Sequence, residues 1–272
     1  MAFDEIARRG LVLLGCGKMG SAMLAGWLRQ GLPAEAVWVI EPRPSDWLKG
    51  LAGVHLNVPL PQAPAVAVVA VKPQMMGEAL PQLAGLGGGA TLVISIAAGT
   101  PIARFEEVLG AATPIVRAMP NTPAAIGRGI TALMGNAAAG EAHMALAEAL
   151  LSAVGETVRL ESEAQMDAVT AVSGSGPAYV FLLIEAMAAA GEAEGLAPHL
   201  AMRLAKATVA GAGALATVEG AEPPDQLRVN VTSPGGTTAA ALEVLMDPDS
   251  GLVPLMRRAI HAAAERSREL AG

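Results

Sequence analysis

The chain has 272 residues, of which 53% are hydrophobic, 16% charged and 3% aromatic, and its formal net charge is −7. Because disordered chains are poor in apolar residues and rich in charge, this composition excludes intrinsic disorder. The acidic balance and the scattered Lys and Arg residues argue against nucleic acid as a partner, and the length suggests two domains.

Chain length, cysteine usage and hydropathy bear on stability and compartment. A chain of this size buries enough surface to fold without a metal or a disulfide. Cys16 is the single cysteine, which fits a reducing, cytoplasmic compartment. The stretch Ala79–Ala103 is uncharged and long enough to span a membrane, but Pro and Gly residues interrupt it. We therefore expect a soluble protein that has no membrane partner.

The first part of the chain alternates short apolar runs with helical segments. The runs are nearly continuous rather than alternating in polarity, which is typical of parallel strands buried on both faces. This order predicts a doubly wound α/β sheet with right-handed crossovers. The expected strands are Leu11–Leu14, Val37–Ile40, Val66–Val71, Thr91–Ile96, Pro114–Ala118, Ile130–Met134 and Thr157–Leu160, and the helices between them include Met19–Gln30, Gln74–Leu83, Pro101–Leu109 and Glu141–Val154.

After Leu160 the sequence contains no convincing strand-like run. Segments rich in Gly and Pro, such as Ser173–Pro177, Pro223-Pro224 and Ser233–Gly236, separate apolar helical segments. The expected helices are Met166–Val172, Ala178–Glu194, His199–Val218, Thr238–Leu245 and Leu252–Leu270. We therefore predict an α/β domain over residues 1–160 and an all-helical domain over residues 161–272.

The segment Gly15-Cys16-Gly17-Lys18-Met19-Gly20 directly follows the first expected strand and opens a helix. In such a pattern the first glycine permits a tight turn, the second lets the backbone approach a pyrophosphate, and the third allows close helix–strand packing. The helix N-terminus then faces the anion. The segment predicts a dinucleotide site, and a glycine-rich turn without a binding role is the structural alternative.

Two charged residues after the second expected strand bear on the choice of coenzyme. Glu41 can accept hydrogen bonds from the ribose hydroxyls of NAD, whereas Arg43 can pair with the 2′-phosphate of NADP. Pro42 and Pro44 stiffen the loop, and Ser45 adds a hydroxyl. These residues alone favour the two coenzymes about equally.

A second glycine-containing segment, Asn230–Thr238, precedes an apolar helix. Gly235 and Gly236 leave their N–H groups unobstructed, and such groups at a helix N-terminus bind anions. We expect a substrate carboxylate at this turn. A helix start capped by Thr237 or Thr238 is the alternative.

Taken together, these segments resemble the pyrroline-5-carboxylate reductase family, whose members complete proline biosynthesis. The matching segments are Gly15–Gly20, Ala70–Gln74, Ser95–Gly99, Arg117–Pro123, Asp167–Tyr179 and Val231–Thr238, in collinear order over nearly the whole chain. The resemblance implies a Rossmann-like dinucleotide-binding domain and a helical domain for substrate binding and dimerisation. It also implies hydride transfer from NADPH, with NADH as the alternative, to the cyclic imine 1-pyrroline-5-carboxylate to give L-proline. Glu41-Pro42-Arg43 departs from the Ser/Asn-Arg loops common in the family.

The resemblance further implies roles for individual residues. Coenzyme contacts are implied for Gly15, Cys16, Gly17, Lys18, Met19, Gly20, Glu41, Arg43, Asn57, Ala70, Val71, Lys72, Pro73, Ala97, Ala98, Met119, Pro120, Asn121 and Asn230. Contacts to the imino acid are implied for Glu163, Ser233, Gly236, Thr237 and Thr238, with Thr238 as the catalytic hydroxyl beside the ring nitrogen. For Lys72, a structural charge at a strand end is the alternative.

The histidines His55, His143, His199 and His261 lie in no motif that would orient them as an acid–base pair. A carbonyl reductase usually needs a proton donor tuned near neutral pH. A cyclic imine protonates readily, and its iminium carbon is already electrophilic, so alignment of the hydride donor is the main requirement. A site without a catalytic His therefore fits imine reduction.

Two other functions fit parts of this pattern. A β-hydroxyacid dehydrogenase also joins a nucleotide domain to helices, but it needs a catalytic Lys on a helix where Pro177–Glu185 has none. A non-catalytic nucleotide-binding scaffold would share the fold. Loss of the carboxylate loop would favour the scaffold, whereas Ser233–Thr238 is intact.

The helical half also predicts self-association. Ala178–Ala190 contains one charge, Glu185, and Ala207–Val218 contains none. A helix that is apolar nearly all round must be buried on several sides. We therefore expect a homodimer, with larger assemblies of dimers as an option.

Overall fold

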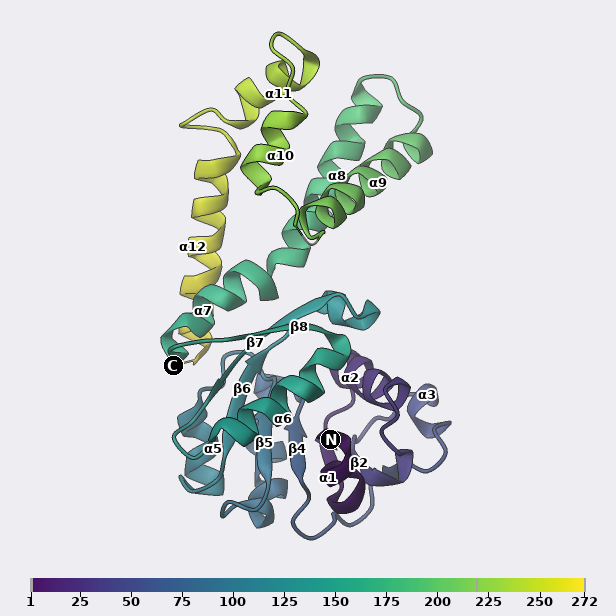
Figure 1. Cartoon of the computed structure of the whole chain (residues 1–272), viewed down its shortest axis with the longest axis vertical. Helices are drawn as coiled ribbons and strands as arrows, with labels where there is room; N and C mark the ends of the chain where they lie inside the picture. Colours follow the sequence, from purple (N-terminus) through teal and green to yellow (C-terminus); the bar gives the residue numbers. More distant parts are fainter. Residues whose placement is uncertain (1, 219, 272) are drawn as a thin grey trace. The chain divides into compact units, whose positions relative to one another are not determined.

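The computed structural model describes residues 2–218 and 220–271 (Figure 1). The chain packs as two compact units. Of the described residues, the first unit holds those from 2 to 174 and from 264 to 271, and the second holds those between Ser175 and Ala263. The domain boundary expected at residue 160 stays a prediction, since these units describe packing alone.

A mixed eight-stranded sheet forms the centre of the first unit, in the order β3-β2-β1-β4-β5-β6-β7-β8. The strands are β1 (Leu11–Leu14), β2 (Val37–Ile40), β3 (His55–Leu56), β4 (Val66–Val69), β5 (Leu92–Ser95), β6 (Ile115–Met119), β7 (Gly129–Gly135) and β8 (Gly155–Arg159). Strands β1 to β6 are parallel, β7 is antiparallel to β6, and β8 is parallel to β7. The chain leaves β1 for β2 on one side and reaches β4 on the other, so the carboxyl ends of these strands meet at a topological switch point.

Helices cover both faces of this sheet (Figure 1). They are α1 (Ala2–Arg9), α2 (Lys18–Arg29), α3 (Asp46–Lys49), α4 (Met76–Ala79), α5 (Ile102–Leu109), α6 (Glu141–Leu151) and α7 (Met166–Val169), with short 3₁₀ segments between some of them. Leu11 and Leu13 of β1 pack into a core with residues of α2 and α6, whereas Val12 and Leu14 pack with residues of α4 and α5. Because successive residues of a strand point to opposite faces, continuous apolar runs are what such a two-faced sheet needs.

The described residues of the second unit form helices joined by turns, and none of them is in a strand. Its helices are α8 (Gly176–Ala193), α9 (Pro198–Ala216), α10 (Pro224–Asn230) and α11 (Thr237–Leu245), and α12 (Leu252–Ala271) begins in it and ends in the first unit. In the first unit, the Ser267 hydroxyl of α12 donates to Asp167 of α7 at 2.6 Å. The α/β class with a following helical part is therefore confirmed.

Several sequence expectations need correction. The strand β3 and the helices α1 and α10 were not expected. Most of Gln74–Leu83 is 3₁₀ rather than α-helix, and Pro81 lies in the 3₁₀ segment Leu80–Leu86. The glycines of Ser173–Pro177 do not end a helix, because a π-helical turn, Thr170–Gly174, leads directly into α8.

One continuous helical segment of the described residues, Glu163–Ala193, is long and apolar enough to cross a membrane by length and composition. The stretch considered in the sequence analysis, Ala79–Ala103, is a different segment and folds as short helical pieces and β5. In the most apolar window of Glu163–Ala193, only 11% is buried inside the chain. The apolar surface of α8 is therefore a feature that the function must explain.

Candidate functional site

The glycine turn between β1 and α2 has the geometry that its spacing predicts. Gly15 has a φ of +91°, and a Cβ there would lie 2.8 Å from the Ala70 carbonyl oxygen. A Cβ on Gly20 would lie 2.5 Å from the Gly15 carbonyl oxygen, so both positions require glycine for close packing. A Cβ on Gly17, by contrast, would meet open space. Gly17 is also the N-cap of α2 and makes no side-chain cap, which leaves helix N–H groups available to an anion.

A pocket of about 870 Å³ opens at this turn, at the carboxyl ends of β1, β2 and β4. Its lining includes nine of the residues expected to contact a coenzyme: Gly15, Cys16, Gly17, Lys18, Glu41, Arg43, Ala70, Val71 and Lys72. It also includes residues with no predicted role, among them Ser21, Gln74, Met75, Glu78 and Gln82. Ser21 lies within α2, whereas Gln74 to Gln82 follow β4 in sequence. Their position after a strand at a switch point is the signal that could have identified Gln74 to Gln82.

The Glu41 carboxylate joins the β2 loop to the glycine turn. Its Oε2 accepts the backbone N–H of Cys16 at 2.8 Å, and its Oε1 accepts the N–H of Arg43 at 2.9 Å. Among the described residues, none forms a salt bridge with the Arg43 guanidinium, which is exposed at the pocket. The Glu41 carboxylate is thus fixed by hydrogen bonds, whereas the Arg43 guanidinium has no salt bridge among the described residues.

Asn57 holds Glu41 from the other side. Its side-chain Oδ1 accepts the N–H of Glu41, and its Nδ2 donates to the Glu41 carbonyl, both at 2.9 Å. Asn57 has a φ of 52°, in the left-handed region that Asn tolerates better than most residues. It does not line the pocket, so its expected contact with a coenzyme stays a prediction.

Cys16 belongs to the glycine turn between β1 and α2, and its side chain is buried. Burial is the main cause that raises the pKa of its thiol above the usual value. A neutral thiol at this place adds no negative charge to the anion site. Met19 and Gly20 lie in α2 outside the pocket lining.

The remaining expected coenzyme residues of the first unit follow β4, β5 and β6. Pro73 opens a 3₁₀ turn after Lys72, and Ala97 is buried after β5, where Ala98 is exposed. These positions lie at the same carboxyl edge of the sheet as the glycine turn. Their roles stay predictions, because none of them except Lys72 lines the pocket.

The residues at the end of β6 make contacts within the first unit. The Asn121 Oδ1 accepts the N–H of Ile130 at 3.0 Å, which ties the loop after β6 to β7. A Cβ on Gly174 would lie 2.5 Å from the Met119 Cε, so the first glycine of the Ser173–Pro177 segment serves close packing on β6. Pro120, between Met119 and Asn121, is buried.

Glu163, expected near the imino acid, is engaged within the first unit. Its Oε1 accepts from the Arg117 guanidinium at 2.6 Å and from the N–H of Ile102 at 2.9 Å. Arg117 belongs to β6 and is only 6% exposed. The carboxylate therefore neutralises a buried cation and satisfies the first turn of α5, and its contact with substrate stays a prediction.

The predicted carboxylate turn lies in the second unit, between α10 and α11. Gly235 has a φ of +69°, and the N–H of Gly236 donates to the Ser233 carbonyl at 3.0 Å. Gly236 is the N-cap of α11 and no side chain caps the helix, so the alternative of a start capped by Thr237 or Thr238 is wrong. The exposed or half-exposed hydroxyls of this turn are available to a ligand.

Asn230 ends α10 and bonds within its own segment. Its Oδ1 accepts from Gln226 at 2.8 Å, and its Nδ2 donates to Glu222. Its expected coenzyme contact stays a prediction.

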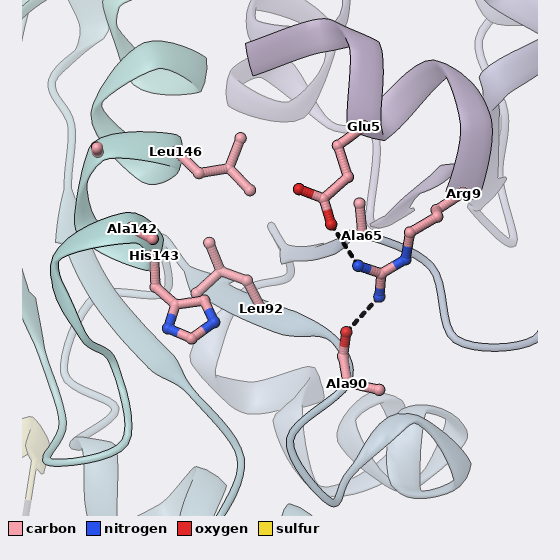
Figure 2. Close-up of a pocket in the computed structure, with 9 residues that line it drawn as sticks. Glu5, Arg9, Ala65, Ala90, Leu92, Ala142, His143 and Leu146 are labelled. Atoms are coloured by element: carbon pink, nitrogen blue, oxygen red, sulfur yellow. Dashed lines mark hydrogen bonds and ion pairs between the residues drawn. The ribbon is translucent and has the colours of Figure 1, made fainter. Parts of the chain in front are cut away.

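A second pocket, of about 380 Å³, lies at the opposite, amino-end edge of the sheet (Figure 2). Figure 2 shows Glu5 and Arg9 of α1 on one side of it and His143 and Leu146 of α6 on the other. Arg9 pairs with Glu5 at 2.5 Å and donates to the carbonyls of Pro64 and Ala90. Because most of its donors are used, Arg9 acts here as a clamp on the loops before β4 and β5.

Comparison with family models identifies both parts of the chain. Residues 163–270 match the family described as pyrroline-5-carboxylate reductase dimerisation. Residues 10–99 match the family described as NADP oxidoreductase, coenzyme F420-dependent.

Individual relatives agree over nearly the full length. The pyrroline-5-carboxylate reductase of Pseudomonas aeruginosa is 42% identical over 266 residues, which cover 96% of each chain. The solved structure of the Coxiella burnetii enzyme is 36% identical with a TM-score of 0.89, covering 97% of this chain and 99% of that one. The Plasmodium falciparum enzyme, solved with NADP bound, is 29% identical with a TM-score of 0.82 and covers 97% and 98%. The chain belongs to the pyrroline-5-carboxylate reductase family.

Proposed function

We propose that the protein reduces 1-pyrroline-5-carboxylate to L-proline with NADPH, the last step of proline biosynthesis. The observation that carries the proposal is the pocket at the glycine turn, in a chain whose full length matches reductases of this name. Family membership favours this activity over the β-hydroxyacid dehydrogenase and scaffold alternatives.

The residues present fit a dinucleotide. Gly17 leaves open space at the head of α2, and no side chain caps the helix N-terminus there. Lys18, Arg43 and Lys72 contribute positive charge to the pocket lining. An uncapped helix N-terminus beside cations is suited to a pyrophosphate. The relative from Plasmodium falciparum, solved with NADP bound, supports the same coenzyme here.

When bound, NADPH supplies the hydride. The protein's own residues bind and orient the reactants. The glycine turn and the segment Ala70–Pro73 would hold the nucleotide. The loops after β5 and β6, with Ala97, Ala98 and Met119–Asn121, would contact the nicotinamide. Orientation of this kind is one of the main contributions that a protein makes to a hydride transfer from a cofactor.

The turn Ser233–Thr238 holds the imino acid. Its backbone N–H groups bind the carboxylate, and the Thr238 hydroxyl hydrogen-bonds the ring nitrogen. None of the residues lining the coenzyme pocket is a histidine. His55 stacks on Trp38, and His143 lies at the opposite edge of the sheet. Because a cyclic imine protonates readily, the proposal assigns no acid–base role to a histidine.

The active form is a cytoplasmic homodimer, with larger assemblies of dimers as an extension. Support comes from the match of residues 163–270 to a dimerisation family and from the exposed apolar side chains of α8. A second subunit would cover that surface, and obligate interfaces bury about 2,000–5,000 Å².

The test is oxidation of NADPH at 340 nm with purified protein and 1-pyrroline-5-carboxylate. A 3-hydroxy acid with NAD serves as the competing reaction. We expect turnover with the imine alone. Turnover with the hydroxy acid, or with neither substrate while the coenzyme still binds, would contradict the proposal.

A further inference from the structure

Two side chains of opposite charge follow β2, and one of them is held by hydrogen bonds whereas the other has no ion-pair partner among the described residues. The Glu41 carboxylate is half-buried and bonded through both oxygens to backbone N–H groups, those of Cys16 and Arg43. The guanidinium of Arg43 is exposed and has no salt bridge among the described residues. A bonded carboxylate keeps its place when a ligand arrives, whereas a free guanidinium must be ordered by one.

Asn57 makes the position of Glu41 rigid. Its side chain forms two hydrogen bonds with the backbone of Glu41, which lies between β2 and the loop. Glu41 is therefore held at its backbone by the residue after β3 and at its carboxylate by the glycine turn after β1. Each oxygen of a carboxylate accepts more than one hydrogen bond, so acceptor capacity remains on the pocket side.

NADH and NADPH differ at the adenosine ribose, which carries a 2′-hydroxyl in NADH and a 2′-phosphate in NADPH, and Glu41 and Arg43 interact differently with these two groups. A ribose 2′-hydroxyl can donate to a fixed carboxylate at the end of β2. A 2′-phosphate carries only acceptors and negative charge, so the same carboxylate repels it while Arg43 attracts it. Within one loop, Glu41 therefore favours NADH and Arg43 favours NADPH.

We propose that Glu41 is the residue that sets coenzyme specificity in this protein, and that it admits NADH as a second coenzyme by lowering the advantage of NADPH. Asn57 is the positioning residue that keeps the Glu41 carboxylate in place. The inference rests on the proposed function, because it concerns the coenzyme of the same reaction.

The first arm of the test uses the unaltered protein. Dissociation constants for NADPH and NADH are measured by titration calorimetry without imine. We expect the two constants to differ by less than about 30-fold, that is, by less than about 2 kcal/mol. A protein that binds NADPH more than about 30-fold tighter than NADH overturns the inference.

The second arm removes the charge of Glu41. In Glu41→Gln we expect the NADPH:NADH affinity ratio to rise by at least about tenfold, because repulsion of the phosphate is lost and the 2′-hydroxyl loses its charged acceptor. Asn57→Ala is expected to raise the ratio by a smaller factor, because the two side-chain hydrogen bonds that hold the Glu41 backbone are lost. Glu35→Gln, which removes an exposed carboxylate before the other end of β2, is the matched control and should leave the ratio unchanged.

A rise of less than about tenfold in folded Glu41→Gln overturns the inference. If circular dichroism shows that Glu41→Gln is unfolded, Glu41→Ser takes its place under the same criterion. If neither variant folds, the first arm decides. Binding without imine separates this inference from the proposed function. Turnover of imine with an unchanged ratio refutes the role of Glu41 alone, and a shifted ratio without imine turnover refutes the reductase activity alone.

Discussion

The two units of the chain bury their apolar side chains to very different extents. In the first unit, Trp27, Phe105 and the central residues of the sheet are fully buried, and the Trp27 indole N–H donates to the Leu150 carbonyl at 2.8 Å. In the second unit the buried cluster consists of the small residues Ala188, Ala201 and Ala205. Large apolar side chains there stay exposed, including Phe181 (57%), Leu182 (65%) and Val244 (72%).

This difference in burial identifies the second unit as the part of the molecule that depends on a partner. Full burial of a large apolar side chain stabilises a fold by about 1.5–3 kcal/mol, and an alanine contributes much less. The first unit therefore completes its own core, whereas the second unit leaves most of that stabilisation to be gained from another surface. A second copy of the same helices supplies an apolar surface of matching chemistry.

The largest expected effect comes from breaking the apolar surface of the second unit. Leu182→Asp places a charge on the exposed side of α8 and should convert the dimer to a monomer, because a charge buried in an apolar interface is strongly unfavourable. We expect imine reduction to fall by about 10³-fold, since the site would lose its alignment. Light scattering and NADPH oxidation measure both effects, and coenzyme binding should persist.

Ala103→Asp is the control for that variant. It places the same charge on an exposed position of α5 in the first unit. Assembly and activity should be unchanged. Loss of the dimer in both variants would mean that the apolar surface of α8 is not specific for association.

A second substitution concerns the predicted substrate turn of the second unit. Thr238→Ala should lower kcat/KM for the imine by about 10²-fold, because a hydrogen bond to the reacting nitrogen is lost. The dissociation constant for NADPH should stay the same, since the coenzyme pocket belongs to the first unit. Thr238→Ser should restore most of the activity. Steady-state parameters that equal those of the unaltered protein would refute the role of this hydroxyl.

A smaller effect is expected within the first unit. Arg43→Ala removes a cation from the coenzyme pocket and should raise the KM for NADPH by about tenfold, the size of one charge-assisted hydrogen bond. The KM for NADH should hardly change. Equal effects on both coenzymes would show that Arg43 does not meet the 2′-phosphate.

The smallest effect concerns the stability of the first unit and its pH dependence. Arg159 of β8 bonds Glu141 and Glu148 of α6, at distances between 2.7 and 2.8 Å, and these bonds lower the pKa of both carboxyls below the usual 4.5. A lowered folded-state pKa gives stability above the usual value, and this stability is lost as the pH falls through the folded pKa. Arg159→Gln should therefore lower Tm by a few degrees at most at pH 7, and by less at pH 3. Calorimetry at both values measures this, and a Tm difference that grows towards pH 3 would contradict the sign.

Much of the fold could be predicted from the sequence, because strands buried on both faces leave continuous apolar runs. β1, β2, β4, β5 and β6 all lie within or next to such runs. β3 was missed because two residues, His55 and Leu56, are too short for any periodicity. α1 was missed because its charged residues hide an amphipathic helix, in which Ile6 is fully buried.

The candidate site was predicted less evenly. The glycine turn has a spacing with a physical reason at each position, so the pocket around it could be expected. The hydrogen bonds that Glu41 makes with Cys16 and with Asn57 join segments that are far apart in sequence, so no local sequence pattern predicts them. The same holds for the ion pair between Arg117 and Glu163, because only the folded chain brings β6 next to the segment before α7.

The dependence of the second unit on a partner is tested most directly by light scattering at the concentration used in the assay. We predict that the species that reduces the imine has at least twice the 27.4 kDa mass of one chain. A fully active species of 27.4 kDa would contradict the account.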